Sequence, residues 1–349
     1  MAKERGTSGK TLADVAKAMG LSTSAVSLAL RGKGGVSEAT RARIVETAQA
    51  MGYSKAAATG PRTPRTARTV GLLIRNIYGG MPSDNVFYGP VMGGVEENCR
   101  ARKLGLMLAV FDFDDKYYPV ELPAIATDRS CDGLIVLGGL FSAENGAVLR
   151  SHPTVLVDAY SVDPCFDSVL IDNLAGAQTA VEHLISLGHR DIAILGSAED
   201  SFPGILERRR GYERAIGAAG LSPHYLDSGR EPPEEEPAKA LAYLRAHPEV
   251  TAVFCCYDAV AMMLLRVAAD NGIRIPEQLS VVGFDDIDLA AHLNPPLTTM
   301  AVDKVGMGRI AVSLLAHRMA YPNGSATETL VRTTLMKRGS SGPAPVTSR

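Results

Sequence analysis

The stretch TLADVAKAMGLSTSAVSLALRGKGGVSEATRARIVETAQAM, residues 11–51, decides how the first part of this chain folds. Thr11 is a good helix N-cap, and apolar residues follow it at helical spacing until Gly20, which ends the first predicted helix. Ser22 completes a short turn and can cap a second helix over residues 23–30. The pattern therefore predicts two short helices joined by a tight turn.

A third helix is predicted after Ser37, another residue suited to an N-cap, and it ends at Gly52. Its apolar residues recur on one face, as do those of the two helices before it. The residues expected to face inward are Leu12, Val15, Ala16, Met19, Val26, Ala29 or Leu30, Ile44, Val45, Ala48 and Met51. Three short helices that share one small core, a small all-α domain, follow from this spacing.

The outward face of the second predicted helix carries Thr23, Ser24, Ser27 and Leu28. These small or hydroxylated side chains can approach base edges and phosphates without carrying an unpaired charge into a DNA groove. Helical periodicity alone favours a three-helix packing module with a polar face. The capped helices and the glycine turn instead favour a helix-turn-helix that reads DNA.

Charge is distributed unevenly along the chain. Residues 1–69 hold twelve Lys and Arg against four Asp and Glu, a net charge of +8. Since the whole chain carries −2, the remaining residues carry −10. A basic head on an acidic body is typical of a phosphate-binding module attached to a part that does not bind nucleic acid.

Two stretches, TLADVAKAMGLSTSAVSLALRG and VSEATRARIVETAQAMGY, carry a resemblance to a known family. Their small residues, caps and closing Gly-Tyr pair resemble the head of the LacI-type bacterial transcriptional repressors. The resemblance implies that the base-reading and phosphate-contacting positions are Thr11, Ser22, Thr23, Ser24, Ser27, Arg31, Ser37 and Thr40. Two residues depart from the family: Leu28, where an arginine is common, and Arg31, where an asparagine is common. These departures concern the operator sequence rather than DNA binding itself.

Residues 54–69, SKAAATGPRTPRTART, change abruptly to Ala, Thr, Pro and Arg and are predicted to be a linker. Gly60, Pro61 and Pro64 oppose a continuous helix. Members of the resembled family place a hinge helix here, whose leucine enters the minor groove of DNA. The corresponding residue is Arg62, so a contact through charge with a narrow minor groove is expected instead. A merely solvated tether is an equally good interpretation.

From Val70 onward, apolar runs alternate with amphipathic stretches. The apolar runs include TVGLLIRN, LMLAVF, CDGLIVLGG, PTVLVDAY, SVLID, DIAILGS, TAVFCCYD and LSVVGFDD. Strands that alternate with helices predict parallel sheets with helices on both faces. The pattern runs through two similar rounds, so it predicts two α/β lobes with a ligand cleft at the carboxyl ends of their strands.

The family resemblance extends to about residue 336. The segments DNLAGAQTAVEHLISLGHRDIAILG and LSVVGFDDIDLAAHLNPPLTT look like that family's effector-binding core, which is similar to periplasmic sugar-binding proteins. The expected organisation is a helix-turn-helix domain over residues 1–53, the linker 54–69, a two-lobed effector-binding and dimerisation core over 70–336, and a disordered tail over 337–349.

Several side chains are expected at the mouth of the cleft. Asp258 and Asp285 lie just past apolar strands, where their carboxylates can accept ligand hydroxyl or amino donors. The resemblance adds Arg208, as an arginine that holds the ligand, and Phe87 and Tyr88, as an aromatic pair that covers it. The alternatives are surface ion pairs or helix caps for the charged residues and core packing for the rings.

Tyr257 stands where the resembled family commonly has an asparagine. An aromatic ring in place of a compact amide weakens the case for a simple sugar as the ligand. The complete set of expected effector-binding residues is Phe87, Tyr88, Arg208, Tyr257, Asp258 and Asp285.

Length and composition set further bounds. A chain of 349 residues that is 46% hydrophobic and 21% charged is ordinary for a globular protein with more than one domain. No apolar run reaches the roughly 18 residues of a membrane span, and MAKERGTSGK at the N-terminus has no hydrophobic signal core. We therefore expect a cytoplasmic protein that does not associate with a membrane.

Motifs for catalysis and metal binding are missing from the sequence. It contains no GxSxG, no phosphate loop and no HExxH, and its seven histidines are scattered. The five cysteines show no metal-type pair and are expected to be reduced and mostly buried, with a redox or metal device at Cys255 and Cys256 as the alternative. We expect no enzymatic activity, no cofactor and no metal.

Together these features predict a homodimeric, sequence-specific repressor that binds palindromic double-stranded DNA. A small-molecule effector in the cleft, with a sugar or sugar derivative among the candidates, is expected to control its operator affinity. The alternatives are a small-molecule binding protein without a DNA role, and an α/β enzyme that uses the acidic cleft.

Overall fold

The computed structural model describes residues 12–30, 37–51, 68–76, 82–226 and 236–345. The chain divides into two compact units, Met1–Thr66 and Ala67–Arg349. None of the helices in the described ranges is both long enough and apolar enough to cross a membrane.

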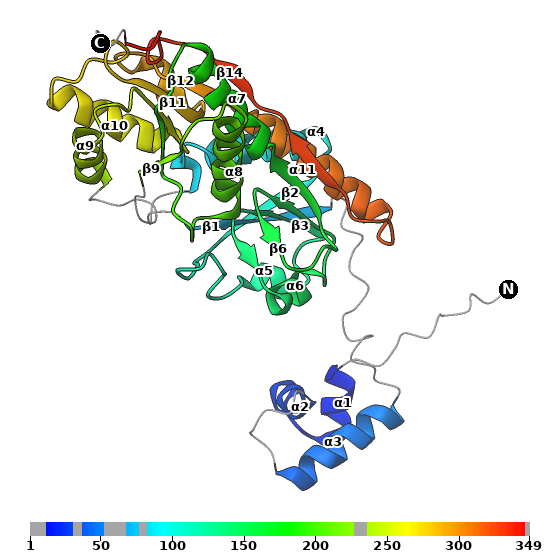
Figure 1. The fold of residues 1–349 in the computed structure, drawn as a ribbon. Helices are drawn as coiled ribbons and strands as arrows, with labels where there is room; N and C mark the ends of the chain where they lie inside the picture. Colours follow the sequence, from blue (N-terminus) through cyan, green and yellow to red (C-terminus); the bar gives the residue numbers. More distant parts are fainter. Residues whose placement is uncertain (1–11, 31–36, 52–67, 77–81, 227–235, 346–349) are drawn as a thin grey trace. The chain divides into compact units, whose positions relative to one another are not determined.

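The first unit is a bundle of three short helices (Figure 1). They are α1 (Leu12–Met19), α2 (Thr23–Leu30) and α3 (Glu38–Ala50). Their shared core consists of Val15, Ala16, Val26, Ala29, Ile44 and Ala48. Val45, which was expected to face inward, is instead 37% exposed. One residue advances the helix by about 100°, so Ile44 and Ala48 form the buried stripe and Val45 points away from it.

The first lobe of the second unit is built on a parallel sheet. In spatial order its strands are β13 (Glu328–Val331), β7 (Asp167–Ile171), β5 (Thr154–Val157), β3 (Gly133–Leu137), β1 (Thr69–Arg75) and β2 (Gly105–Phe111). A small pair of strands, β4 (Leu140–Phe141) and β6 (Tyr160–Ser161), lies beside it. The central strands are apolar and buried along their whole length, as expected for a sheet covered on both faces.

The second lobe repeats this plan with one reversed strand. In spatial order its strands are β14 (Thr334–Met336), β12 (Thr298–Ala301), β11 (Ser280–Asp285), β10 (Ala252–Cys255), β8 (Ile192–Leu195) and β9 (His224–Leu226). Within this sheet β14 pairs antiparallel with β12, and the other pairs are parallel. The predicted fold class, two α/β lobes with parallel sheets after a helical head, is confirmed.

Helices cover both faces of each sheet (Figure 1). In the first lobe they are α4 (Tyr88–Ala101), α5 (Ala124–Thr127), α6 (Ala143–Leu149) and α11 (Lys304–Ala320), with the 3-10 turn η1 (Pro82–Asp84). In the second lobe they are α7 (Asn173–Ser186), α8 (Pro203–Ala218), α9 (Glu236–Ala246) and α10 (Asp258–Asp270), with η2 (Asp288–His292). Helices α4 and α11 cross closely because Gly94 and Gly308 lie at the contact, where an added Cβ would meet backbone oxygen at 2.1 Å.

The described chain passes between the lobes repeatedly. It enters the second lobe between β7 and α7, returns to the first between β12 and α11, and crosses again between β13 and β14. Each lobe therefore contains residues from distant parts of the sequence. Strands β13 and β14, two residues apart in the chain, complete different sheets.

The expectation of a disordered tail from residue 337 is wrong for the part that is described. Ser340 is fully buried, accepts a hydrogen bond from the N–H of Thr298 (2.8 Å) and donates one to the carbonyl oxygen of Val281 (2.6 Å). His189 lies 3.1 Å from the carbonyl oxygen of Gly342. The described part of the tail packs through hydrogen bonds, so the absence of an apolar pattern did not indicate disorder. Residues 346–349 lie outside the described ranges.

Candidate functional site

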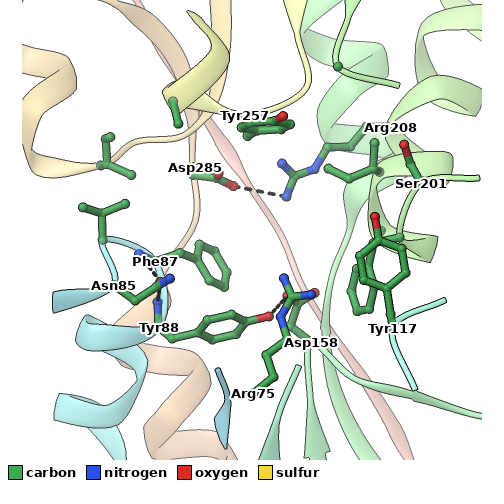
Figure 2. Close-up of a pocket in the computed structure, with 17 residues that line it drawn as sticks. Arg75, Asn85, Phe87, Tyr88, Tyr117, Asp158, Ser201, Arg208, Tyr257 and Asp285 are labelled. Carbon is green, nitrogen blue, oxygen red and sulfur yellow. Dashed lines mark hydrogen bonds and ion pairs between the residues drawn. The ribbon is translucent and has the colours of Figure 1, made fainter. Parts of the chain in front are cut away.

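A cavity of about 150 Å³ lies between the two lobes of the second unit (Figure 2). Its walls come from the carboxyl ends of β1, β8 and β11 and from the first turns of α4, α8 and α10. This is the edge at which open parallel sheets bind small ligands. Charged and aromatic side chains from both lobes point into it.

Arg208 and Asp285 form the charged wall of the second lobe. The Nη2 atom of Arg208 lies 3.1 Å from Oδ1 of Asp285, and the two residues are only 5% and 8% exposed. Arg208 also donates from Nε to Asn173 Oδ1 (2.7 Å) and from Nη1 to the carbonyl oxygen of Cys256 (2.5 Å). Its guanidinium lies 3.8 Å from the ring centroid of Phe284. The arginine is therefore held in one orientation before any ligand arrives.

The backbone at the end of β11 is strained. Asp285 has a φ of 111° and Asp286 a φ of 50°, values that side chains other than glycine seldom adopt. Lys304 holds this turn, since its Nζ donates to the carbonyl oxygens of Asp285 (2.5 Å) and Asp286 (3.0 Å). The turn aims the Asp285 side chain at the cavity.

Arg75, the last residue of β1, lies inside a cage of aromatic rings on the first-lobe side. Its guanidinium carbon is 5.0 Å from the ring centroid of Phe202, 5.4 Å from Phe113, 5.7 Å from Tyr88 and 6.0 Å from Tyr117. Such cation–π contacts favour a guanidinium that is partly withdrawn from water. Phe202 precedes α8 of the second lobe, so both lobes contribute to the cage.

Asp158 follows β5 and accepts a hydrogen bond from the Tyr88 hydroxyl (2.7 Å). Removal from bulk water raises the pKa of Asp158, while this hydrogen bond and the charge of Arg75 act in the opposite direction. Gly138 leaves room for the group, because an added Cβ would lie 2.7 Å from Arg75 Cδ and 2.8 Å from the Tyr88 hydroxyl. The first lobe thus presents an arginine and an aspartate to the cavity.

Asp158 and Asp285 occupy equivalent places in the two sheets. Strands β5 and β11 are each third in their spatial order, and Asp158 and Asp285 lie at their carboxyl ends. Asp158 has a φ of 45°, so both carboxylates are presented by left-handed backbone. Each lobe therefore offers one carboxylate and one guanidinium to a ligand held between them.

Most of the expected effector-binding residues lie in this cavity: Phe87, Tyr88, Arg208, Tyr257 and Asp285. Asn85 positions Phe87 and Tyr88 at the start of α4. Its Oδ1 accepts hydrogen bonds from the backbone N–H groups of Phe87 (3.0 Å) and Tyr88 (2.7 Å). Figure 2 shows the two rings on the first-lobe side of the cavity and Tyr257 on the opposite side.

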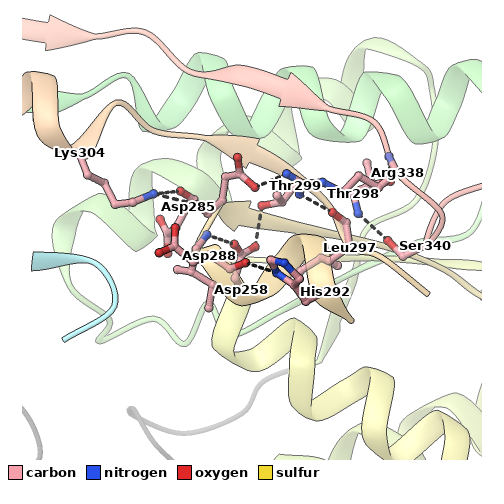
Figure 3. A network of polar contacts seen from close by, with 12 residues as sticks. Asp258, Asp285, Asp288, His292, Leu297, Thr298, Thr299, Lys304, Arg338 and Ser340 are labelled. Atoms are coloured by element: carbon pink, nitrogen blue, oxygen red, sulfur yellow. Dashed lines mark hydrogen bonds and ion pairs between the residues drawn. The ribbon is translucent and has the colours of Figure 1, made fainter. Parts of the chain in front are cut away.

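Asp258 does not line the cavity, which corrects the expectation drawn from its place after β10. It is fully buried, where its Oδ1 accepts the Thr299 hydroxyl (2.6 Å) and its Oδ2 accepts the N–H of Ile287 (2.9 Å) (Figure 3). Burial, and then the nearby charge of Asp285, raise the pKa of Asp258 to about 7. Asp258 joins α10 to β12 and to the loop after β11.

Sequence reasoning missed several cavity residues, namely Arg75, Asn85, Tyr117, Asp158 and Phe202. Two of them were detectable. Arg75 and Asp158 follow the apolar runs TVGLLI and PTVLV directly, which is the signal that singled out Asp285. The other three lie in loops or at helix starts whose course no periodicity reports.

In the helical head, two of the three predicted caps are confirmed, and the third, Thr11, lies outside the described residues. Ser22 Oγ accepts the N–H of Ala25 (3.2 Å) at the start of α2, and Ser37 Oγ accepts the N–H of Thr40 (3.3 Å) at the start of α3. The Ser37 and Thr40 hydroxyls are 2.8 Å apart. Hydroxyls at helix N-termini are also well placed to meet phosphates.

On the outward face of α2, Thr23 is exposed, Ser27 is half-buried and Leu28 is 40% exposed. The Ser24 side chain and all of Thr11, Arg31 and Arg62 lie outside the described part of the chain.

Comparison with known proteins gives the same division of the chain. The family of "Bacterial regulatory proteins, lacI family" matches residues 11–55, and the "Periplasmic binding protein-like domain" matches residues 181–341. A ribose operon repressor from Haemophilus influenzae is 30% identical over 335 residues, which cover 95% of this chain and 98% of that protein. The chain belongs to the LacI family.

Other members of the LacI family are similarly close. The transcriptional repressor PurR of Aliivibrio fischeri is 31% identical over 320 residues, covering 88% of this chain and 91% of that protein. A structure of the regulator CelR in complex with cellobiose has a TM-score of 0.68 at 27% identity, over 95% of this chain and 99% of the other. A LacI family regulator from Enterococcus faecium with bound ribose has a TM-score of 0.67 at 26% identity, over 79% and 99%.

This LacI-family chain is thus a DNA-binding transcriptional regulator with an effector-binding core. The relatives named above are regulators rather than enzymes, and none of them supports a small-molecule binding protein without a DNA role.

Proposed function

We propose that this LacI-family regulator is a cytoplasmic homodimeric repressor that binds a palindromic operator. A small molecule in the cavity between the lobes sets its affinity for that operator. One recognition helix of eight residues, α2, reaches only a few base pairs. Two-fold symmetry doubles the contact, which is the reason for a palindrome.

We assign the effector to sugars or sugar derivatives. The observation that carries this assignment is the presence of one guanidinium and one carboxylate on each side of the cavity, Arg208 paired with Asp285 on one side and Arg75 near Asp158 on the other. Carboxylates accept from hydroxyl groups and guanidinium forks donate to them, so two such sets suit a ring with several hydroxyls. The aromatic rings between them can cover its apolar face. Relatives whose structures contain ribose or cellobiose support this class.

The homodimer is supported by the edge strand β2. Four of its side chains, those of Leu106, Met107, Leu108 and Val110, are between 37% and 49% exposed. Strand β2 has a sheet neighbour only on the β1 side in the described chain. An open edge with apolar side chains on both faces is a surface that a second copy would cover.

For the operator, we propose that Thr23, Ser24, Ser27 and Leu28 of α2 meet base edges. Ser22, Ser37 and Thr40 would meet phosphates beside the helix starts that they cap. Thr11 and Arg31 complete the set implied by the family, and Arg62 would enter the minor groove. In this proposal residues 1–53 form the DNA-binding domain, 54–69 the linker and the part from residue 70 onward the effector core.

The effector assignment is tested by ligand screening on the intact protein. Thermal unfolding is measured with pentoses, hexoses, disaccharides, sugar phosphates and purines, and each ligand that raises the Tm is added to a gel-shift assay on the regulator's own promoter DNA. A sugar that raises the Tm and changes operator affinity supports the proposal. A purine that does both while every sugar fails would replace the ligand class. Absence of any specific DNA complex would contradict the repressor function.

A further inference from the structure

A second cluster of ligating side chains lies at the other edge of the second-lobe sheet. Asp191 precedes β8, His224 begins β9, and His247 and Glu249 lie in the loop that leads from α9 to β10. These three strands are parallel, so their amino ends meet at one edge. The effector cavity lies at the carboxyl ends, so the length of the strands separates the two places.

The spacing of the cluster fits a small cation. His224, His247 and Glu249 each offer one ligand atom, and these atoms all lie within 4.8 Å of one another. The His247 Nδ1 atom is 3.0 Å from Glu249 Oε1, and the His224 Nε2 atom is 3.4 Å from Asp191 Oδ1. Ligands bound at about 2.0–2.2 Å around a tetrahedral ion lie roughly 3.3 Å apart. A modest contraction therefore brings His224, His247 and Glu249 to the spacing of three ligands around one ion, and Asp191 lies beside His224.

The imidazole rings of His224 and His247 are held in place by contacts with Tyr243. The Nδ1 atom of His224 lies 3.1 Å from the Tyr243 hydroxyl, which leaves Nε2 facing the carboxylates. The ring of Tyr243 stacks on His247 with centroids 4.2 Å apart, and the two imidazoles are 5.9 Å apart. A partner on the second ring nitrogen is typical of a metal-binding histidine because it fixes the tautomer and the ring orientation.

We propose that His224, His247 and Glu249, with Asp191 as fourth ligand, bind one divalent ion of the zinc class. Two imidazoles and two carboxylates suit Zn²⁺, Co²⁺ or Ni²⁺ better than the all-oxygen shells of Ca²⁺ and Mg²⁺. The spacing of the histidines along the sequence indicated no metal, since His224 and His247 are separated by the whole of α9. The site stands on these contacts alone and is independent of the effector proposal.

The bound ion would join segments that the described fold otherwise links weakly. Strand β9 has three residues and pairs only with β8 among the described strands. A metal between the start of β9 and the loop after α9 ties this edge to the centre of the sheet. It should therefore raise the stability of the second lobe and leave the effector cavity unchanged.

The test uses the full, untagged chain, freed of metal with a chelator and carrying Cys165→Ser to remove the exposed thiol. Zn²⁺ is titrated by calorimetry, and Co²⁺ by its visible absorption. We expect one equivalent per chain, a tetrahedral Co²⁺ spectrum and a Tm increase of roughly 5 °C at a hundredfold excess over Kd. The double variant His224→Gln/His247→Gln should bind neither ion. The matched control His292→Gln/His317→Gln, which changes two exposed histidines elsewhere, should bind both as before.

A variant that preserves the fold makes the outcome decisive. Glu249→Gln alters an exposed carboxylate, so its unfolding in the presence of chelator should match that of the parent chain. Removing a residue that only hydrogen-bonds to a metal ligand weakens metal binding about 10–100-fold. Glu249 is proposed to bind the ion directly, so its loss should weaken Zn²⁺ binding by more than about tenfold. Absence of saturable binding in the parent chain, or equal affinities in the parent and the Glu249→Gln and His224→Gln/His247→Gln variants, overturns the proposal.

Discussion

The Arg208 guanidinium and the Asp285 carboxylate face each other at 3.1 Å across the wall of the cavity, and both are nearly buried. Withdrawing two charges from water costs about as much as their pairing returns, so folding stability alone does not account for this pair. Both groups nevertheless border open space in the cavity. A ligand that bonds to both at once uses groups already oriented and already desolvated.

We expect Arg208→Ala to abolish the response to effector while operator affinity stays within a few fold. Removing a charged group that hydrogen-bonds a buried ligand typically costs 2–5 kcal/mol of binding free energy, so effector binding should weaken by at least about 30-fold. Calorimetry with the effector and gel shifts with the operator measure the two affinities. Arg210→Ala is the matched control, because Arg210 lies on the same helix but is exposed and pairs with Glu207. If Arg208→Ala and Asp285→Asn both fail to fold, the pair is structural and the site assignment fails.

The sequence located the correct edge of the sheets but not every side chain at that edge. Asp258 and Asp285 both follow apolar runs, yet Asp285 borders the cavity whereas Asp258 turns inward to Thr299. Arg75 and Asp158 carry the same signal and do reach the cavity. Which side chain faces the ligand depends on the backbone turn after the strand, such as the left-handed φ of Asp158 and Asp285. Strand periodicity carries no information on that turn.

The alternation of strands and helices likewise predicted two lobes but not their composition. Helix α11 and strand β13 come late in the chain and return to the first lobe, where β13 pairs with β7. A pattern along the chain reports local structure, whereas the sheet that a late strand joins is decided by which edge is open. The polar residues after 336 show a related limit, because Ser340 packs by hydrogen bonds that hydropathy does not register.

Leu108→Glu on β2 should convert the proposed dimer into a monomer. A charge on an apolar edge strand must be desolvated when a second copy covers it, and like charges then meet across the two-fold axis. Sedimentation at micromolar concentration measures the change, and operator affinity should fall with it because half of the palindrome is lost. Leu289→Glu is the control, since Leu289 is also exposed but lies on η2 of the second lobe. A Leu108→Glu protein that remains a dimer would place the interface elsewhere.

The basic head should make operator binding steeply dependent on salt. With a net charge of +8 over residues 1–69, a dimer that contacts several phosphates should show a log–log slope of several units. Arg41→Ala should lower affinity equally for all DNA sequences, whereas Thr23→Ala together with Ser27→Ala should change the preferred sequence. Arg266→Ala, an exposed substitution in the effector core, is the control. A nearly flat salt dependence on specific DNA would contradict phosphate binding by the head.

Asp258 should make the effector core less stable as the pH rises. Burial raises its pKa from the ordinary 3.8 to about 7, so between these values the folded chain holds a proton that the unfolded chain has released. The stability that this proton contributes is fully present below about pH 4 and is lost as the pH rises through about 7, with a slope of about 1.4 kcal/mol per pH unit.

Asp258→Asn tests this dependence, because its amide mimics the neutral acid and can still meet Thr299 and the N–H of Ile287. In thermal unfolding from pH 4.5 to 8, the Tm of the natural chain should fall relative to the variant up to about pH 7 and run parallel to it above that. The variant should keep its response to effector, since Asp258 lies outside the cavity. Parallel curves over the whole range would mean that Asp258 stays ionised in the folded protein. A lost effector response would mean that Asp258 takes part in effector binding.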